Sequence, residues 1–114
     1  MIERYTRPGM GAVWTQQAKF QSWLDVELAA TDAWAAEGVV PPEAAAACRE
    51  RASFTVEEIN AREEITNHDV AAFVDVVAAS IGEEGRWIHF GLTSSDVLDT
   101  ALAVQLTKAG EILV

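Results

Sequence analysis

Two short polar clusters contain the residue types in this 114-residue chain that could do chemistry. The first is Asn67-His68-Asp69, and the second is His89 followed by Gly91-Leu-Thr-Ser-Ser-Asp96. Both histidines of the chain lie in these clusters, and histidine is the side chain whose protonation changes near neutral pH. Each cluster lies where a helix is expected to begin, so free amides and the positive end of the helix dipole point outward. The two clusters are therefore candidate sites for a carboxylate or a phosphate.

The same residues also have a purely structural interpretation. Asn67 and Thr93 are residue types that cap helix N-termini, and the histidines would then be loop residues with satisfied hydrogen bonds. No metal site is indicated, because two histidines 21 residues apart come with no clear third ligand. Cys48 is the single cysteine, which excludes a cysteine zinc site, and no glycine-rich phosphate loop is present.

A third candidate lies near the start of the chain, where Tyr5 stands between Arg4 and Arg7. Arginines near a terminus are usually only solvated, so Arg4 and Arg7 also have an interpretation without a ligand.

The whole chain has 18 acidic and 8 basic residues and a net charge of −10. Nucleic-acid binding needs a positive stripe that replaces condensed counterions, so this function class is excluded.

Helices must position these clusters, and the sequence predicts an all-α fold. Residues 1–10 read as an irregular arm. Apolar residues at helical spacing, proline at a first turn and a Thr55–Glu58 capping box predict helices over 15–37, 41–52, 55–65 and 70–81. A short extended piece is expected over 87–92. The hydroxyl residues at 93–95 then begin a last helix.

The distribution of apolar residues bears on the cellular location of the protein and on its full length. The longest uncharged run, residues 8–18, is well short of the roughly 18 apolar residues that a membrane span needs. No apolar stretch follows the basic residues near Met1, so a cytoplasmic location without membrane contact is expected. The last helix stays apolar up to Val114, whereas a finished chain more often ends in polar residues, so we expect a longer natural protein.

Three blocks of the sequence resemble one enzyme family. They are Ile2-Glu-Arg-Tyr-Thr-Arg-Pro-Gly-Met10, Thr66-Asn-His-Asp-Val70 and His89-Phe-Gly-Leu-Thr-Ser-Ser-Asp-Val97, in this order. Together they are similar to bacterial adenylosuccinate lyases, which belong to the fumarase/aspartase superfamily. The third block alone would indicate only the superfamily, and the other two blocks select this member. The resemblance covers the whole chain.

The resemblance implies a β-elimination that needs no cofactor. Fumarate leaves adenylosuccinate to give AMP, and the related succinylated aminoimidazole carboxamide ribotide is cleaved in purine synthesis. A base removes a proton next to a carboxylate, an acid protonates the departing nitrogen, and fixed donors stabilise the dianion. The principal acid and base would lie beyond Val114.

The resemblance also assigns roles to the candidate residues. Arg4 and Tyr5 would hold the phosphate and ribose end of the nucleotide, and His89 would contact phosphate. Thr93 and Ser94 would grip the succinyl carboxylates. His68 would bind substrate and support catalysis. Asn67 and Asp69 would also bind substrate as the rest of the second block, in which some relatives carry arginine at the position of Asn67.

The resemblance finally implies an architecture. Residues 1–92 would form most of a small N-terminal helical domain, and residues 93–114 would begin the first long helix of a central bundle. The complete enzyme would be a homotetramer whose sites combine residues from three subunits. A different class of function also remains open: a non-catalytic all-α interaction or oligomerisation module, in which the polar clusters are only caps.

Overall fold

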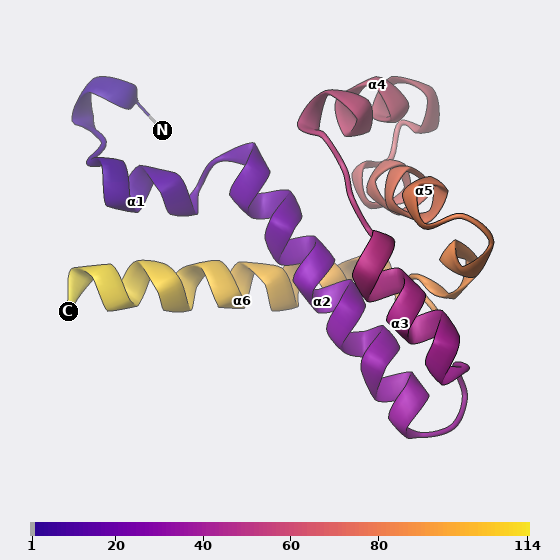
Figure 1. Cartoon of the computed structure of the whole chain (residues 1–114). Helices are drawn as coiled ribbons and strands as arrows, with labels where there is room; N and C mark the ends of the chain where they lie inside the picture. Colours follow the sequence, from indigo (N-terminus) through magenta and orange to yellow (C-terminus); the bar gives the residue numbers. More distant parts are fainter. Residues whose placement is uncertain (1) are drawn as a thin grey trace.

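The computed structural model describes residues 2–114, and this range contains helices and no strand, so the predicted all-α class is confirmed. Two 3-10 turns, η1 and η2, accompany the α-helices (Figure 1). The elements in chain order are η1 (Glu3–Tyr5), α1 (Pro8–Val13), α2 (Gln16–Ala36), α3 (Pro42–Arg51), α4 (Val56–Thr66), α5 (Asp69–Ile81), η2 (Glu83–Trp87) and α6 (Ser94–Leu113).

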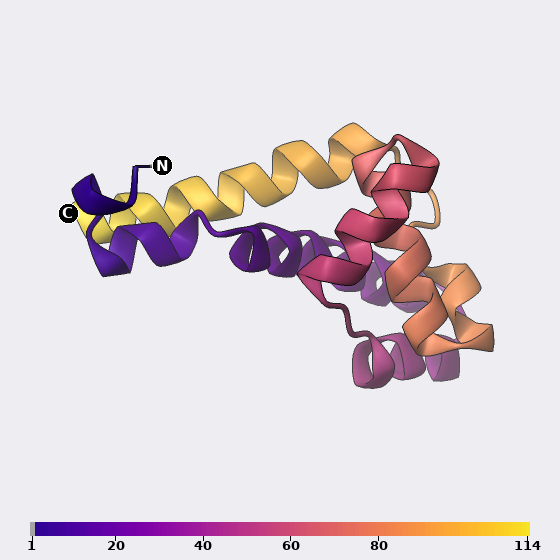
Figure 2. The same ribbon diagram turned by 90° about the horizontal axis from the view of Figure 1, so that it is seen from above.

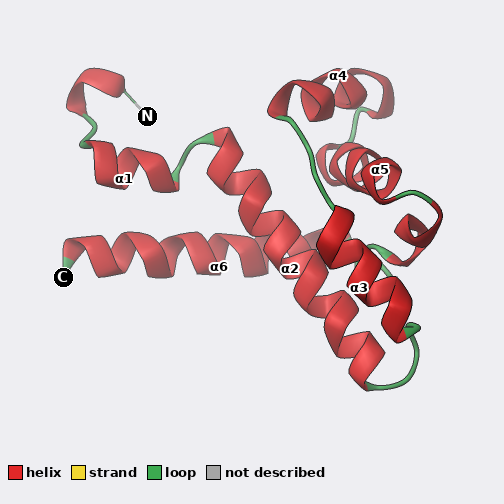
Figure 3. Ribbon diagram, in the orientation of Figure 1, coloured by secondary structure: helices red, strands yellow, loops and turns green. Residues whose placement is uncertain are grey.

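The long helices α2 and α6 pack on each other and connect two ends of an elongated molecule of 46 × 34 × 23 Å. The short helix α1 lies along the C-terminal half of α6, whereas α4 and α5 pair near the start of α6 (Figures 1 and 2). Helix α3 packs on α2 and on η2. The connecting segments are short (Figure 3). Helix α1 and the α4–α5 pair therefore lie at opposite ends of α6.

An aromatic cluster forms the centre of the core between α2, α5 and the segment before α4. The rings of Phe20, Trp23 and Phe73 lie within 6.1 Å of one another, centroid to centroid, and Phe54 joins them. Trp23 and Phe73 are almost completely buried. Burying side chains of this size contributes most of the hydrophobic free energy of such a core.

Capping residues set the helix boundaries close to their predicted places. The Thr15 side chain accepts a hydrogen bond from the Ala18 amide at 3.1 Å and begins α2. The Thr55 side chain accepts from the Glu58 amide at 3.1 Å and begins α4, as the capping-box pattern predicted. The Glu58 carboxylate, however, accepts from the Thr55 hydroxyl and not from its backbone amide.

Two local predictions are wrong. Residues 8–13 form a short helix instead of an irregular arm, because Pro8 supplies the fixed φ of a first helical residue and needs no amide partner there. Residues 88–91 form a turn instead of an extended piece. This turn contains two left-handed residues, His89 at φ 68° and Gly91 at φ 72°.

Helix α6 has one buried and one exposed apolar face. Val97 and Ala101 are buried against the rest of the chain, and the Gln105 side chain donates to the Val13 carbonyl at 2.9 Å, which fixes the end of α1 on α6. Leu102, Leu106 and Leu113 are largely exposed. Among the helices of residues 2–114, none combines the length and hydrophobicity of a membrane-spanning segment.

Candidate functional site

The structure brings the two polar clusters together at the starts of α5 and α6. His68, His89 and Ser94 line one cleft of about 300 Å³, whose other walls come from α5. The His68 Nε2 atom lies 3.4 Å from the Ser94 hydroxyl oxygen, although the two residues are 26 positions apart in the sequence. The juxtaposition of these three side chains makes the cleft the candidate functional site.

His68 is itself the N-cap of α5. Its Nδ1 atom accepts a hydrogen bond from the Ala71 amide at 3.1 Å, and the Thr66 hydroxyl donates to the His68 carbonyl at 2.9 Å. Because Nδ1 accepts, the proton of the neutral imidazole is on Nε2, the nitrogen on the side of Ser94. The cap therefore fixes both the orientation of the ring and the nitrogen that can donate to a ligand.

The neighbours of His68 have structural roles of their own. Asn67 does not cap α5; it ends α4 in a left-handed conformation at φ 51°. An Asp69 carboxylate oxygen accepts from the Val70 amide at 2.8 Å and lies 3.8 Å from His68 Nδ1. Since that nitrogen already accepts from Ala71, the Asp69 carboxylate does not receive a hydrogen bond from the ring.

His89 is held by a residue that the sequence analysis did not single out. Its Nδ1 atom lies 2.6 Å from a carboxylate oxygen of Glu27 in α2, and Glu27 is completely buried. Burial raises the pKa of the Glu27 carboxyl above its ordinary value of 4.5, while the hydrogen bond and charge of His89 act in the opposite direction. The signal in the sequence was a carboxylate at helical spacing from Phe20, Trp23 and Trp34, on the apolar face of the predicted helix.

The turn that carries His89 is attached to α2 at a second point. The Trp34 indole donates to the Phe90 carbonyl at 3.0 Å, and the two rings pack edge to face. At Gly91, a Cβ atom would lie 2.8 Å from the Trp34 ring. The turn therefore requires a glycine both for its positive φ and for its close approach to α2.

The start of α6 supplies the hydroxyl groups of the cleft. The Thr93 amide donates to the Asp96 carboxylate at 2.9 Å, so Thr93 does act as the cap residue of α6. Ser94, the first helical residue, lines the cleft. No group of residues with metal-ligand geometry occurs in the part of the chain that the structure describes.

Arg4 and Tyr5 do not reach this cleft within one chain. The Arg4 guanidinium lies over the Tyr5 ring at 4.8 Å, and both residues are exposed. Tyr5 lines a different groove with Ile112 and Leu113 of α6. Helix α6 has 20 residues, which at 1.5 Å per residue place its end about 30 Å from its start at Ser94.

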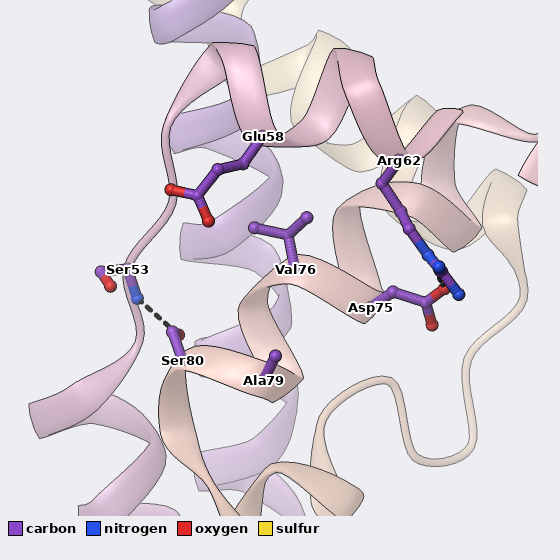
Figure 4. Close-up of a pocket in the computed structure, with 7 residues that line it drawn as sticks. All are labelled: Ser53, Glu58, Arg62, Asp75, Val76, Ala79 and Ser80. Atoms are coloured by element: carbon purple, nitrogen blue, oxygen red, sulfur yellow. Dashed lines mark hydrogen bonds and ion pairs between the residues drawn. The ribbon is translucent and has the colours of Figure 1, made fainter. Parts of the chain in front are cut away.

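A second groove of about 610 Å³ lies between α4 and α5 (Figure 4). Arg62 pairs with Asp75 across it at 3.0 Å, and the Ser53 amide donates to the Ser80 hydroxyl at 3.0 Å. None of the residues predicted to bind substrate lines this groove. These interactions connect α4 and the segment before it to α5.

The sequence is similar to those of known adenylosuccinate lyases. The chain is 52% identical over 113 residues to the adenylosuccinate lyase of Bacillus subtilis (strain 168), and 51% identical over 116 residues to that of Aquifex aeolicus (strain VF5). Each alignment covers 99% of this chain and 26% of the relative, so the chain spans about a quarter of the length of these relatives.

The structure is also similar to a solved one. A fumarate lyase from Mesorhizobium sp. BNC1 superposes with a TM-score of 0.78 at 27% identity, over 86% of this chain and 24% of that one. The predicted fumarase/aspartase fold is therefore confirmed. A family model described as "Lyase" matches residues 3–114, and the chain accordingly belongs to this lyase family.

Proposed function

We propose that this chain works as part of an adenylosuccinate lyase. The enzyme eliminates fumarate from adenylosuccinate to give AMP, and from the succinylated aminoimidazole carboxamide ribotide, without a cofactor. The observation that carries the proposal is the cleft in which His68, His89 and Ser94 meet. The identity to adenylosuccinate lyases over 99% of the chain supports the choice of substrate.

In this proposal the cleft binds the anionic part of the substrate. The start of α6 offers backbone amides and the Thr93 and Ser94 hydroxyls to the succinyl carboxylates. His68 donates from Nε2 as negative charge develops during elimination, which supports catalysis. Asn67 and Asp69 hold the α4–α5 connection on which the His68 ring depends. The principal acid and base come from residues outside this chain.

In this proposal Arg4 and Tyr5 bind the phosphate and ribose end of the nucleotide. The site to which they contribute is formed together with another subunit. Both are exposed near the far end of α6, and neither lines the cleft of its own chain. A homotetramer with sites shared between subunits would bring the arm of one chain to the cleft of another. The cytoplasmic tetramer then contains complete sites, each with the cleft of one chain and the Arg4–Tyr5 segment of another.

The exposed apolar face of α6 supports the proposed division of the chain. Residues 1–92 form a small helical domain, and residues 93–114 begin a bundle helix whose partners cover Leu102, Leu106 and Leu113. Large apolar side chains at this spacing on one helix face are typical of helix–helix contacts. The same face would also serve a non-catalytic oligomerisation module, so activity must decide between the two.

The test is fumarate release from adenylosuccinate. The complete enzyme, meaning the longer polypeptide that we propose contains this chain, is expected to release fumarate and AMP in equal amounts. The succinylated carboxamide ribotide should be cleaved by the same preparation. Assembly into a tetramer without fumarate release from either substrate would favour the oligomerisation module and contradict the lyase.

A further inference from the structure

Glu27 is a buried ionisable group that the proposed function leaves unused. It lies on α2, is completely inaccessible to solvent, and contacts His89 from 62 positions away in the sequence. Its second carboxylate oxygen, Oε2, has no hydrogen-bond partner among residues 2–114. A buried carboxylate with an unsatisfied oxygen destabilises a fold, so stability does not explain why Glu27 lies in the core.

The short contact between Glu27 and His89 fixes which nitrogen of the ring is free. At 2.6 Å a proton lies between the carboxylate oxygen and Nδ1, whichever of the two groups carries it. If the carboxylate is ionised, Nδ1 donates to it, and Nε2 carries an N–H in the cationic ring but is an acceptor in the neutral ring. If the carboxyl is protonated, the ring is neutral, accepts at Nδ1 and again carries its N–H at Nε2.

Other ionisable groups of the cleft already have partners. His68 caps α5 through Nδ1, and Asp75 pairs with Arg62 at 3.0 Å. His89 lines the cleft, and its side chain is 24% exposed, so the part of its ring away from Glu27 is open to a ligand. Neither Asp75 nor His68 forms a hydrogen bond with the His89 ring among the described residues.

We propose that Glu27 is a positioning residue for His89. Its carboxylate holds Nδ1 and leaves Nε2 as the ring nitrogen for the cleft, where it acts as an N–H donor to an anionic oxygen of the substrate, in a phosphate or a carboxylate group. This inference rests on the proposed function. Because the pair contains its own counter-charge, it places a donor for an anion inside a chain whose net charge is −10.

The first test is Glu27→Gln in the complete enzyme. Glutamine keeps the shape but removes the negative charge beside Nδ1, so the donor that Nε2 offers to an anion is weakened. We expect KM for adenylosuccinate to rise about tenfold, while kcat changes by less than about threefold.

Inhibition by AMP and by fumarate shows which anion His89 binds. Weaker inhibition of the variant by AMP assigns His89 to phosphate, and weaker inhibition by fumarate assigns it to a carboxylate. Unchanged KM and unchanged inhibition by both products would overturn the proposal.

A matched control separates positioning of the ring from general loosening of the turn. Trp34→Phe removes the indole bond to the Phe90 carbonyl, which is the other attachment of the same turn to α2, and leaves the Glu27–His89 contact in place. KM should stay within about threefold of wild type in this variant. A tenfold rise in KM for Trp34→Phe as well would show that Glu27 acts only by holding the turn.

A measurement on the wild-type enzyme covers the case in which Glu27→Gln does not fold. Histidine labelled with nitrogen-15 reports which ring nitrogens carry protons, and His89→Asn assigns the signals. We expect a protonated Nε2 on His89 at neutral pH, and a shift of that signal when AMP or fumarate binds. An unprotonated Nε2 would overturn the proposal. This result does not depend on turnover, so it stands apart from a failure of the wild-type enzyme to release fumarate, which would contradict only the proposed function.

Discussion

The cleft at the starts of α5 and α6 and the N-terminal arm both carry predicted substrate-binding residues, but only the cleft holds its side chains in place. His68 is fixed by the Ala71 amide and His89 by the buried Glu27 carboxylate. In the arm, the Arg4 guanidinium lies over the ring of Tyr5, and both residues are exposed. A side chain that is already ordered loses less conformational entropy on binding. The side chains of the cleft are therefore ordered by contacts within this chain, whereas the Arg4 and Tyr5 side chains are exposed.

The largest effect is expected for the isolated chain, whose activity shows whether the cleft alone is sufficient for catalysis. We expect residues 1–114 alone to show no fumarate release above the uncatalysed rate, because the proposed acid and base are not among them. The measurement is fumarate production by the purified chain, with the complete enzyme as the positive control. A rate near that of the complete enzyme would show that this chain contains the catalytic residues.

His68→Asn in the complete enzyme tests the cleft side of the comparison. Asparagine caps a helix well, so the fold should remain, but it lacks the Nε2–H donor. Turnover is expected to fall roughly a hundredfold or more, since a donor to developing charge typically contributes this much. Circular dichroism checks the fold. Thr55→Asn is the control, because it makes the same kind of cap change at α4, away from the cleft. Wild-type turnover in His68→Asn would leave His68 as a cap alone.

Arg4→Ala tests the arm side. Removing a charged partner of a phosphate typically costs about 1.5–3 kcal/mol, so KM in the complete enzyme should rise roughly tenfold to a hundredfold. The melting temperature should not change, because Arg4 is exposed and packs against no core residue. Arg51→Ala, at the end of α3, is the matched control for loss of an exposed arginine. A large fall in melting temperature with an unchanged KM would make Arg4 a structural residue.

The smallest expected effect concerns the turn that carries His89. Gly91→Ala forces a Cβ atom into a residue at φ 72°, at 2.8 Å from the Trp34 ring. We expect the free energy of unfolding to fall by about 1–3 kcal/mol, as for other strained backbone positions. Gly110→Ala is the opposite control: a Cβ there meets no atom within 4 Å, and alanine should stabilise α6 by about 0.5–1 kcal/mol. Denaturant unfolding of both variants measures the difference, and equal stability of Gly91→Ala and wild type would contradict the account of the turn.

Local chemistry explains why so much of the helical organisation was predictable. Thr15 and Thr55 begin α2 and α4 through bonds to amides three residues ahead, and Gly82 ends α5 where a stop was expected. Such signals act over a few residues, so they can be read from the sequence alone. The error at 8–13 concerns a local signal too, because Pro8 itself favours a helix start. The turn at 88–91, in contrast, is held by a contact with α2 that is distant in the sequence.

The candidate site divides in the same way. The residue types at 67–69 and 89–94 pointed to anion binding without any structure, because hydroxyls, amides and imidazoles at helix starts have that chemistry wherever they occur. The meeting of His68 with Ser94, and the separation of Arg4 from both, depend on how α5 and α6 pack. Neither relation follows from the spacing of the residues along the chain.

Glu27 shows most clearly what only the tertiary structure decided. In the sequence it is one carboxylate on an apolar helix face, and nothing nearby indicates a partner. In the fold, the α2 face with Glu27 and Trp34 receives the turn of residues 88–91, and the carboxylate meets the His89 ring. The sequence by itself determined where helices begin and which side chains could bind an anion, because those properties arise from neighbouring residues. The partner of a buried charge was decided by packing, because the free energy of burial depends on every group that replaces water around it.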